Sequence, residues 1–286
     1  MIEHLVLSGG FEKGLLQLGI LSVLEERSEF NVQELKTIHG TSIGAFVGAA
    51  LCTGMTASAA ANYFISRPME RDVEAACFTD RERPQKGLID GTLFRSVFSN
   101  LLRAIDLPDD GTLADLYGFS GIDLHMFTVS MEGLALVDLS ASTHPDLPVW
   151  KAIHMSAAVP GVFEPAYLDN GIYVDGGLRN NYPIGQCLAM PGVNRETVFG
   201  ITAFSFGECF STANPDSSIL SYVQDWFLAT MSAIADPVEV NTEGIRTVHL
   251  PKSSPLRQRM PELLLLYDSV AARQELYEKG KLLAPV

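Results

Sequence analysis

The first third of the chain alternates short apolar runs with stretches of helical pattern. Residues 4–7, His-Leu-Val-Leu, predict a short buried strand, and a nearly all-apolar helix is predicted at 15–26. A second apolar run, within residues 32–44, leads into a small-residue helix at 45–51, and a further helix is predicted at 57–66. Strands that pass through glycine turns into helices indicate βα units.

The middle of the chain is more polar. Residues 67–83 are the most charged stretch, and prolines at 68 and 84 interrupt it, so we expect a solvated excursion or a mobile flap. Apolar residues then recur at helical spacing from Phe94 to Ile105 and predict an amphipathic helix. A turn at 106–111 precedes a helix that Thr112 and Asp115 are predicted to cap.

Strand patterns dominate the part that follows. Residues 124–140 alternate around Glu132 and Gly133 and predict a β-hairpin. A small-residue helix at 153–159, closed by a proline turn at 160–165, leads to a strand at 166–174 with a turn signal at 169–171. Beyond residue 190 we expect a strand at 198–205, a helix at 217–235, a strand at 247–250 and a helix near 261–279.

Composition and charge narrow the range of functions. With 47% hydrophobic residues among 286, the chain can bury a sizeable core, and we expect one domain over residues 1–286. The 34 acidic and 20 basic residues give a net charge of −14. This charge repels nucleic acid and anionic membrane surfaces, and no run of Lys and Arg compensates for it, so no nucleic-acid partner is expected.

Cysteine spacing and the N-terminal sequence bear on the cellular environment. The four cysteines, at 52, 77, 187 and 209, include no C-x-x-C pair, which argues against a zinc site and a disulfide scaffold. The N-terminus lacks a basic region and predicts no secretory signal. Residues 40–66 carry no charge but are rich in small residues and broken at 53–56, so a transmembrane helix is not expected. We expect a cytoplasmic protein, either free or in transient contact with a membrane surface.

The sequence Gly40-Thr41-Ser42-Ile43-Gly44 has the G-x-S-x-G pattern of a nucleophile elbow. In such an elbow a strand turns sharply into a helix, and glycines flank the serine because side chains there would clash. The serine hydroxyl then stands clear of the sheet, at a helix N-terminus that favours negative charge. The alternative is a buried serine in an ordinary glycine-rich turn.

A glycine-rich loop, Ser8 to Gly14, follows the first predicted strand. It has neither the lysine of a P-loop, since Leu15 follows Gly14, nor the third-position glycine of a dinucleotide motif, since Phe11 stands there. What remains is a cradle for an anion at a helix N-terminus, and an oxyanion hole is one use for it. A tight turn without a ligand is the other interpretation.

A candidate general base follows the strand at 166–174. Asp175 precedes Gly176 and Gly177, which allow another part of the backbone to come close. After Asp175 the sequence contains one histidine, His249, in a strand-like context. The residues therefore allow a Ser42–Asp175 dyad or a Ser42–Asp175–His249 triad.

Taken in order, these motifs resemble those of the patatin-like phospholipases. The resemblance covers roughly residues 3–190 and includes two further segments, Ser156–Phe163 and Asn181–Ile184. The motifs that carry it are Leu7-Ser8-Gly9-Gly10-Phe11-Glu12-Lys13-Gly14, Gly40-Thr41-Ser42-Ile43-Gly44 and Asp175-Gly176-Gly177. The ordered set is far more specific than any one motif.

The resemblance implies a three-layer α/β/α fold with a mostly parallel central sheet, and hydrolysis of lipid acyl esters. Ser42 would be the nucleophile and Asp175 its base. The oxyanion hole would consist of Gly9, Gly10 and the backbone of Phe11, with Lys13 at the family's basic position. Phe11 departs from the family, which has a third glycine there. The scheme requires no metal and no cofactor, and the sequence leaves the oligomeric state open.

Two other functions stay open at this point. One is an esterase that uses the Ser42–Asp175–His249 triad. The other is a catalytically silent binding module that keeps the fold while Phe11 blocks the oxyanion hole.

Overall fold

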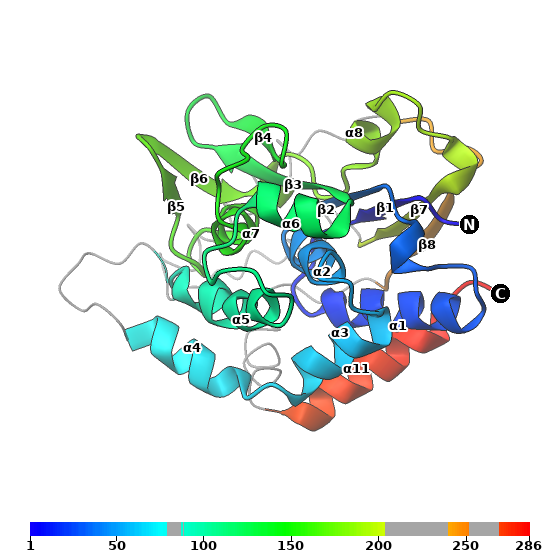
Figure 1. The fold of residues 1–286 in the computed structure, drawn as a ribbon, viewed down its shortest axis with the longest axis horizontal. Helices are drawn as coiled ribbons and strands as arrows, with labels where there is room; N and C mark the ends of the chain where they lie inside the picture. Colours follow the sequence, from blue (N-terminus) through cyan, green and yellow to red (C-terminus); the bar gives the residue numbers. More distant parts are fainter. Residues whose placement is uncertain (79–86, 88, 204–239, 252–268) are drawn as a thin grey trace, which may run out of the picture.

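The strands of the described residues form one central sheet in the order β5-β6-β3-β2-β1-β7-β8, with β4 also paired to β3. The computed structural model in Figure 1 describes residues 1–78, 87, 89–203, 240–251 and 269–286. The strands are β1 His4–Leu7, β2 Thr37–Thr41, β3 Asp123–Ser130, β4 Ala135–Leu139, β5 Ala166–Leu168, β6 Gly171–Asp175, β7 Val198–Thr202 and β8 Arg246–His249.

Most of the sheet is parallel. Strand β1 pairs in parallel with β2 and β7, and the parallel pairing continues to β3 on one side and β8 on the other. Strands β4 and β6 run antiparallel to β3, and β5 runs antiparallel to β6. This arrangement confirms the α/β fold with a mostly parallel sheet.

Helices lie on both faces of the sheet (Figure 1). Their bounds are α1 Lys13–Glu26, α2 Ile43–Leu51, α3 Ala57–Ser66, α4 Met69–Phe78, α5 Thr92–Arg103, α6 Leu113–Ser120, α7 Val149–Ala157, α8 Ile184–Ala189 and α11 Val270–Leu282. Short 3-10 helices span Val32–Glu34, Gly176–Leu178 and Arg195–Thr197.

Strand β1 is buried on both faces, which explains why its sequence does not alternate between apolar and polar residues. Leu5 and Leu7 pack in the main core with α1 and α2, whereas Val6 packs with Ile184 and Cys187 of α8 on the opposite face. A strand that is covered on both faces needs no alternation, and the three consecutive residues Leu5, Val6 and Leu7 are all apolar.

The nearly all-apolar character of α1 has a similar cause, because α1 packs against α2, α3 and α11. Its contact with α11 is close: a Cβ on Gly19 would lie 2.3 Å from the carbonyl oxygen of Tyr277, and a Cβ on Gly280 would lie 2.4 Å from that of Leu16. Two glycines therefore allow the C-terminal helix to dock on the first one.

Most of the predicted elements are confirmed. The predicted helices at 15–26, 45–51 and 57–66 are α1, α2 and α3, and the amphipathic stripe lies on α5. Thr112 and Asp115 form the predicted capping box of α6. The hairpin at 124–140 is β3 and β4, and the strand predicted at 166–174 is divided by its turn into β5 and β6. The strands predicted at 198–205 and 247–250 correspond to β7 and β8.

The expectation of a solvated excursion at residues 67–83 is wrong over Met69–Phe78, which is helix α4. Arg67 donates two hydrogen bonds to Asp72, at 2.7 and 3.0 Å, and both side chains are almost nine-tenths buried. This internal pairing neutralises two of the charges that suggested a solvated segment, and Ala76 packs in the core.

Some predictions cannot be compared with the structure. Residues 79–83, the helix predicted at 217–235 and residues 261–268 of the last predicted helix lie outside the described residues. Helix α11, Val270–Leu282, confirms the part of the last predicted helix that lies within the described residues. The organisation as a single domain stays a prediction. Within the described ranges, no helix combines the length and apolar character needed to cross a bilayer.

Candidate active site

Ser42 lies at a sharp turn between β2 and α2, with φ 55° and ψ −121°. Both flanking glycines are required by close backbone contacts. A Cβ on Gly40 would lie 2.6 Å from the amide nitrogen of Ala45, and a Cβ on Gly44 would lie 2.3 Å from the carbonyl oxygen of Leu7. This is the geometry of a nucleophile elbow, in which the serine takes a backbone conformation unusual for a residue with a side chain.

Strand β3 brings Ser42 and Asp175 together. Thr41, the last residue of β2, pairs with Phe127, and Asp175, the last residue of β6, pairs with the next residue, Thr128. Because β4 occupies the other edge of β3, the ends of β2 and β6 meet along one edge. The two candidate catalytic residues are 133 positions apart in the sequence but adjacent in this register.

Gly176 makes this meeting possible. A Cβ at this position would lie 2.1 Å from the carbonyl oxygen of Phe127 and 3.1 Å from Cγ2 of Thr41. Any side chain at residue 176 would therefore push β6 away from the elbow. Gly177 donates its N–H to Oδ1 of Asp175 at 2.6 Å, which fixes the orientation of the carboxyl group.

The carboxyl group of Asp175 is buried, with 1% of the residue exposed. Burial raises its pKa from 3.8 to about 6 and outweighs the opposing effects of the Ser42 hydroxyl and the Gly177 N–H. Oδ2 accepts no hydrogen bond within 3.5 Å from any described residue. The Ser42 hydroxyl is near enough to the carboxyl group to favour its ionised form, but it donates no hydrogen bond of normal geometry to Oδ2. Such catalytic hydrogen bonds are often long before substrate binds.

The glycine loop packs directly on the elbow. A Cβ on Gly9 would lie 3.1 Å from Cβ of Ser42 and 2.4 Å from Oδ1 of Asn181. The Gly9 N–H already donates to the carbonyl oxygen of Asn181, at 3.1 Å. The N–H groups of Gly10 and Phe11 have no acceptor among the described residues. Of the N–H groups of Gly9, Gly10 and Phe11, which the sequence predicts for an oxyanion hole, that of Gly9 is therefore already in a hydrogen bond, and those of Gly10 and Phe11 stay candidates.

Phe11, which stands where the resemblance implies a glycine, has a backbone conformation that is typical of glycine. Its φ is 51°, in the left-handed region that glycine adopts without strain. The side chain is half-buried and packs against the main core. The loop therefore has the backbone conformation expected for a glycine while it carries a phenyl ring.

Lys13 and Gly14 begin α1 beside this loop. Lys13 is buried, its N–H donates to the carbonyl oxygen of Gly10 at 3.1 Å, and a Cβ on Gly10 would lie 2.9 Å from its Cδ. A Cβ on Gly14 would lie 2.6 Å from Cγ1 of Ile43, so Gly14 allows the N-termini of α1 and α2 to pack together. The electrostatic role of Lys13 stays a prediction.

His249 is not part of this arrangement. It is an exposed residue at the end of β8, where it pairs with Thr202 of β7. Strands β1 and β7 separate β8 from β2, which places His249 three strand spacings, about 14 Å, from the end of β2. The fold brings Ser42 and Asp175 together and leaves His249 at the opposite edge of the sheet.

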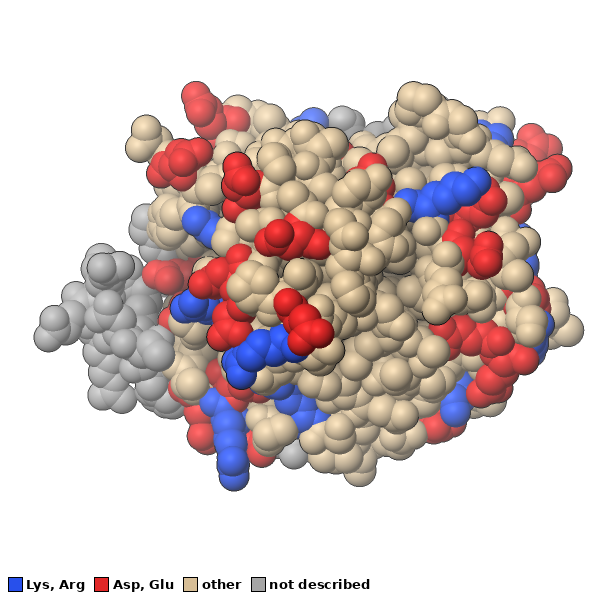
Figure 2. Space-filling model, in the orientation of Figure 1, with Lys and Arg blue, Asp and Glu red and all other residues tan. Residues whose placement is uncertain are grey.

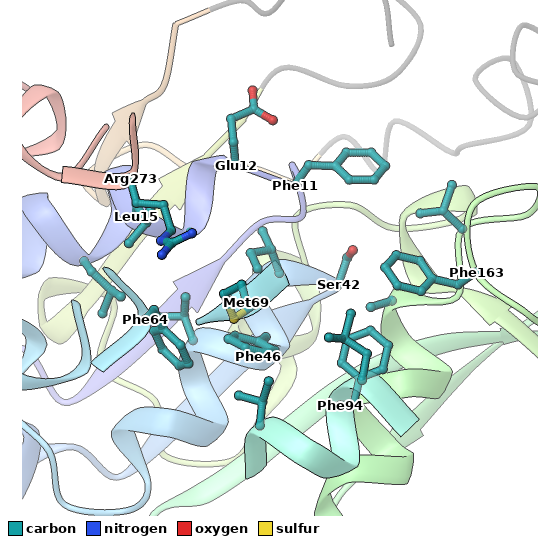
Figure 3. Close-up of a pocket in the computed structure, with 18 residues that line it drawn as sticks. Phe11, Glu12, Leu15, Ser42, Phe46, Phe64, Met69, Phe94, Phe163 and Arg273 are labelled. Carbon is teal, nitrogen blue, oxygen red and sulfur yellow. The ribbon is translucent and has the colours of Figure 1, made fainter. Parts of the chain in front are cut away.

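An apolar pocket opens at Ser42 (Figure 3). Its walls come from α1, α2, α3, α5 and the segment after α7. Aromatic rings pack against one another there: Phe46 lies 4.8 Å from Phe64, and Phe94 lies 5.3 Å from Phe163, between ring centroids. Phe11 lines the pocket near Ser42, and Arg273 of α11 lines it next to Leu15.

Two polar residues at the site received no role from the sequence. The Oγ atom of Ser156 accepts the N–H of Ser42 at 2.9 Å, and Asn181 binds Gly9 through its carbonyl group. Both lie in segments that resemble the family, which was the one available signal. Their contacts span 114 and 172 positions, so no local pattern could predict them.

Over the ranges that the structure describes, no group of three or more His, Cys, Asp or Glu side chains could hold a metal ion.

Comparisons with known proteins identify the family of this chain. The family model for patatin-like phospholipases matches residues 5–188. Over 187 residues the chain is 27% identical to the probable lipid hydrolase 463L of Invertebrate iridescent virus 6, covering 64% of this chain and 62% of that protein. Over 193 residues it is 29% identical to patatin-like phospholipase domain-containing protein 7 of Rattus norvegicus, covering 65% of this chain and 12% of that protein. The chain thus spans less than two-thirds of the length of these relatives.

A solved structure supports the fold. The crystal structure of VipD from Legionella pneumophila is similar with a TM-score of 0.51 and 17% identity, over 99% of this chain and 66% of that one. At this level of identity the similarity concerns the fold alone.

Proposed function

Because the chain belongs to the patatin-like phospholipase family, we propose that it is a lipid acyl hydrolase that cleaves carboxylic esters through a Ser42–Asp175 dyad. The observation that carries the proposal is the position of Ser42. Its hydroxyl lies between a buried carboxyl group and the opening of an apolar pocket. A nucleophile, a base and an apolar binding site are the parts that ester hydrolysis of a lipid needs.

Each group has one role in the reaction. Ser42 Oγ attacks the ester carbonyl carbon while its proton passes to Asp175, which is ionised above pH of about 6. The N–H groups of Gly10 and Phe11 are the candidates to stabilise the oxyanion. Asp175 returns the proton to the departing alcohol and leaves an acyl group on Ser42. Asp175 then takes a proton from water as the water oxygen attacks the acyl carbonyl carbon. The bond between the acyl group and Ser42 Oγ breaks, Asp175 returns the proton to Ser42 Oγ, and the fatty acid is released.

The apolar pocket suits the acyl chain rather than the polar part of the substrate. Phe46, Phe64, Phe94 and Val97 contribute apolar side chains to its wall, and their burial of a hydrocarbon chain would contribute about 0.8 kcal/mol per methylene group. The head group would lie on the outer side of Ser42.

A panel of acyl esters tests the proposal, from p-nitrophenyl acetate to lysophospholipids and diacyl phospholipids. We expect wild-type turnover of at least one lipid ester, and a loss of about 10³-fold or more in Ser42→Ala and in Asp175→Asn. His249→Asn is the matched control and should stay within about 3-fold of wild type, since loss of a catalytic base costs about 10² or more.

Three results would contradict the proposal. Undiminished hydrolysis by folded Ser42→Ala would reject Ser42 as the nucleophile. Collapse of activity in folded His249→Asn would favour the triad. Hydrolysis of no ester by the wild-type protein would favour a silent binding module.

A further inference from the structure

The hydroxyl group of Ser156 connects the nucleophile elbow to the neighbouring strand. It accepts the N–H of Ser42 at 2.9 Å and donates its proton to the carbonyl oxygen of Phe127 at 2.6 Å. Ser156 is completely buried. Because a serine hydroxyl has one proton and lone pairs that accept, these two bonds determine its orientation.

The same end of α7 also holds the candidate base. The N–H of Asp175 donates to the carbonyl oxygen of Ala158 at 3.0 Å. Thr128 Oγ1 lies 2.7 Å from the carbonyl oxygen of Met155 and 2.9 Å from that of Val174, and so connects α7 to β6. The backbone on each side of the dyad is therefore bonded to one short segment, residues 155–158.

We propose that Ser156 is a positioning residue that holds the Ser42 backbone in its strained conformation and at the correct distance from Asp175. This inference rests on the proposed dyad. Ser42 occupies the N-cap position of α2, so its N–H has no partner within the helix, and Ser156 supplies one. A non-glycine residue at φ 55° persists only where its surroundings hold it, and the bond to Ser156 is one such contact.

Ser156→Ala removes the acceptor and leaves two buried groups, the Ser42 N–H and the Phe127 carbonyl, without their partner. We expect the elbow to shift, and kcat to fall by about 10- to 100-fold, since a displacement of about 1 Å can cost 10² in rate. Ser156 does not line the pocket, so KM should stay within about 2-fold. Fluorophosphonate labelling of Ser42 should slow by the same factor as kcat.

Two other variants separate positioning from general stability. Ser140→Ala is the matched control, because Ser140 is equally buried and the hydrogen bonds of its hydroxyl to described residues stay within its own turn, with Ser142 and Thr143. It should keep the wild-type kcat. Ser156→Thr keeps the oxygen atom and should recover at least 10-fold of the lost kcat. If Ser156→Ala does not fold, Ser156→Cys replaces it in the test, because the thiol fills a similar volume but is a weaker acceptor for the Ser42 N–H. Its kcat should be lower than that of wild type and of Ser140→Ala.

Amide hydrogen exchange gives a readout that needs no substrate. Peptides that cover residues 40–46 should exchange faster in Ser156→Ala than in wild type or Ser140→Ala, while peptides from β1 stay unchanged. Wild-type kcat together with wild-type exchange in folded Ser156→Ala would overturn the inference. If Ser42→Ala keeps full activity, the proposed dyad fails, and the exchange comparison still decides whether Ser156 holds the elbow.

Discussion

At the scale of single residues, Asp175 combines a proposed catalytic role with an unfavourable effect on stability. Its pKa is about 6 in the folded protein and 3.8 in an exposed carboxyl group, so the folded state binds the proton more tightly. The unfolded state therefore binds fewer protons between these values, and stability falls as pH rises from about 4 to 6. The same shift makes Asp175 a better base, because a base with a pKa near the working pH accepts protons more effectively.

Replacement of Asp175 by Asn should therefore stabilise the protein at neutral pH while it abolishes activity. We expect a gain of about 1–3 kcal/mol at pH 8, from a shift of about two pKa units at 1.36 kcal/mol each, and no gain near pH 4. Urea unfolding of both proteins across this range measures it. Equal stability at every pH would show that Asp175 is not held in an unfavourable environment.

Phe11 stands at a position of the glycine loop where the resemblance to the family implies a glycine. Phe11→Gly removes the ring that lines the pocket beside Ser42 and relieves a left-handed conformation that costs a side-chain-bearing residue about 1–2 kcal/mol. We expect kcat/KM for a diacyl phospholipid to rise by about 3- to 10-fold relative to p-nitrophenyl acetate. The ratio cancels differences in active enzyme concentration. An unchanged or lower ratio would show that Phe11 does not restrict access.

At the scale of elements, a charged histidine joins β3 to β4. Nδ1 of His125 lies 2.7 Å from Asp138 and Nε2 lies 3.2 Å from Asp123. Burial lowers the pKa of His125, but these two carboxylates outweigh it and raise the pKa to about 9. His39 stacks on His125 at 4.6 Å, and its pKa is held well below 6.5 by burial and then by the charge of His125.

His125→Gln should therefore destabilise the protein in a pH-dependent way. A folded-state pKa above the unfolded value of 6.5 gives stability that is complete below 6.5 and lost as pH rises through about 9. We expect a loss of about 1–3 kcal/mol at pH 6.5 and almost none at pH 10. The exposed His249→Gln is the control for unfolding experiments. A loss that does not depend on pH would show that His125 acts through packing alone.

The elements that the sequence predicts are those with a local cause. The elbow, the hairpin and the capping box of α6 depend on residues within a few positions of one another, and all three are present. Helix α4 was missed because the pairing of its Asp72 with Arg67, which buries two of the charges of this segment, forms only on folding. The meeting of β2 and β6 along β3 depends on strand pairing over long distances, for which the sequence offered motif order alone.

At the scale of the whole molecule, negative charge is widespread. The net charge is −14, and Figure 2 shows acidic side chains distributed over the visible face, with basic ones between them. If the protein is the lipid hydrolase proposed above, it must reach its substrate, and this charge opposes its approach to an anionic surface. Apolar and zwitterionic surfaces carry no such penalty.

Co-sedimentation with vesicles tests this consequence. The two kinds of vesicle consist of phosphatidylcholine alone and of phosphatidylcholine with roughly 30% phosphatidylserine, which gives a negative surface potential. At low salt, binding to the first kind should equal or exceed binding to the second. Salt at about 0.5 M should remove the difference, because the Debye length falls below about 5 Å. Preferential binding to the anionic vesicles at low salt would reveal a basic surface that the net charge conceals.

The central claim is that Ser42 is an activated nucleophile, and covalent labelling measures it most directly. After reaction with a fluorophosphonate, peptide mapping by mass spectrometry should place one adduct on Ser42. Labelling should be absent in Ser42→Ala, and its rate should rise with pH through about 6 as Asp175 ionises. No adduct on the folded wild-type protein, or an adduct on another residue that persists in Ser42→Ala, would contradict the account.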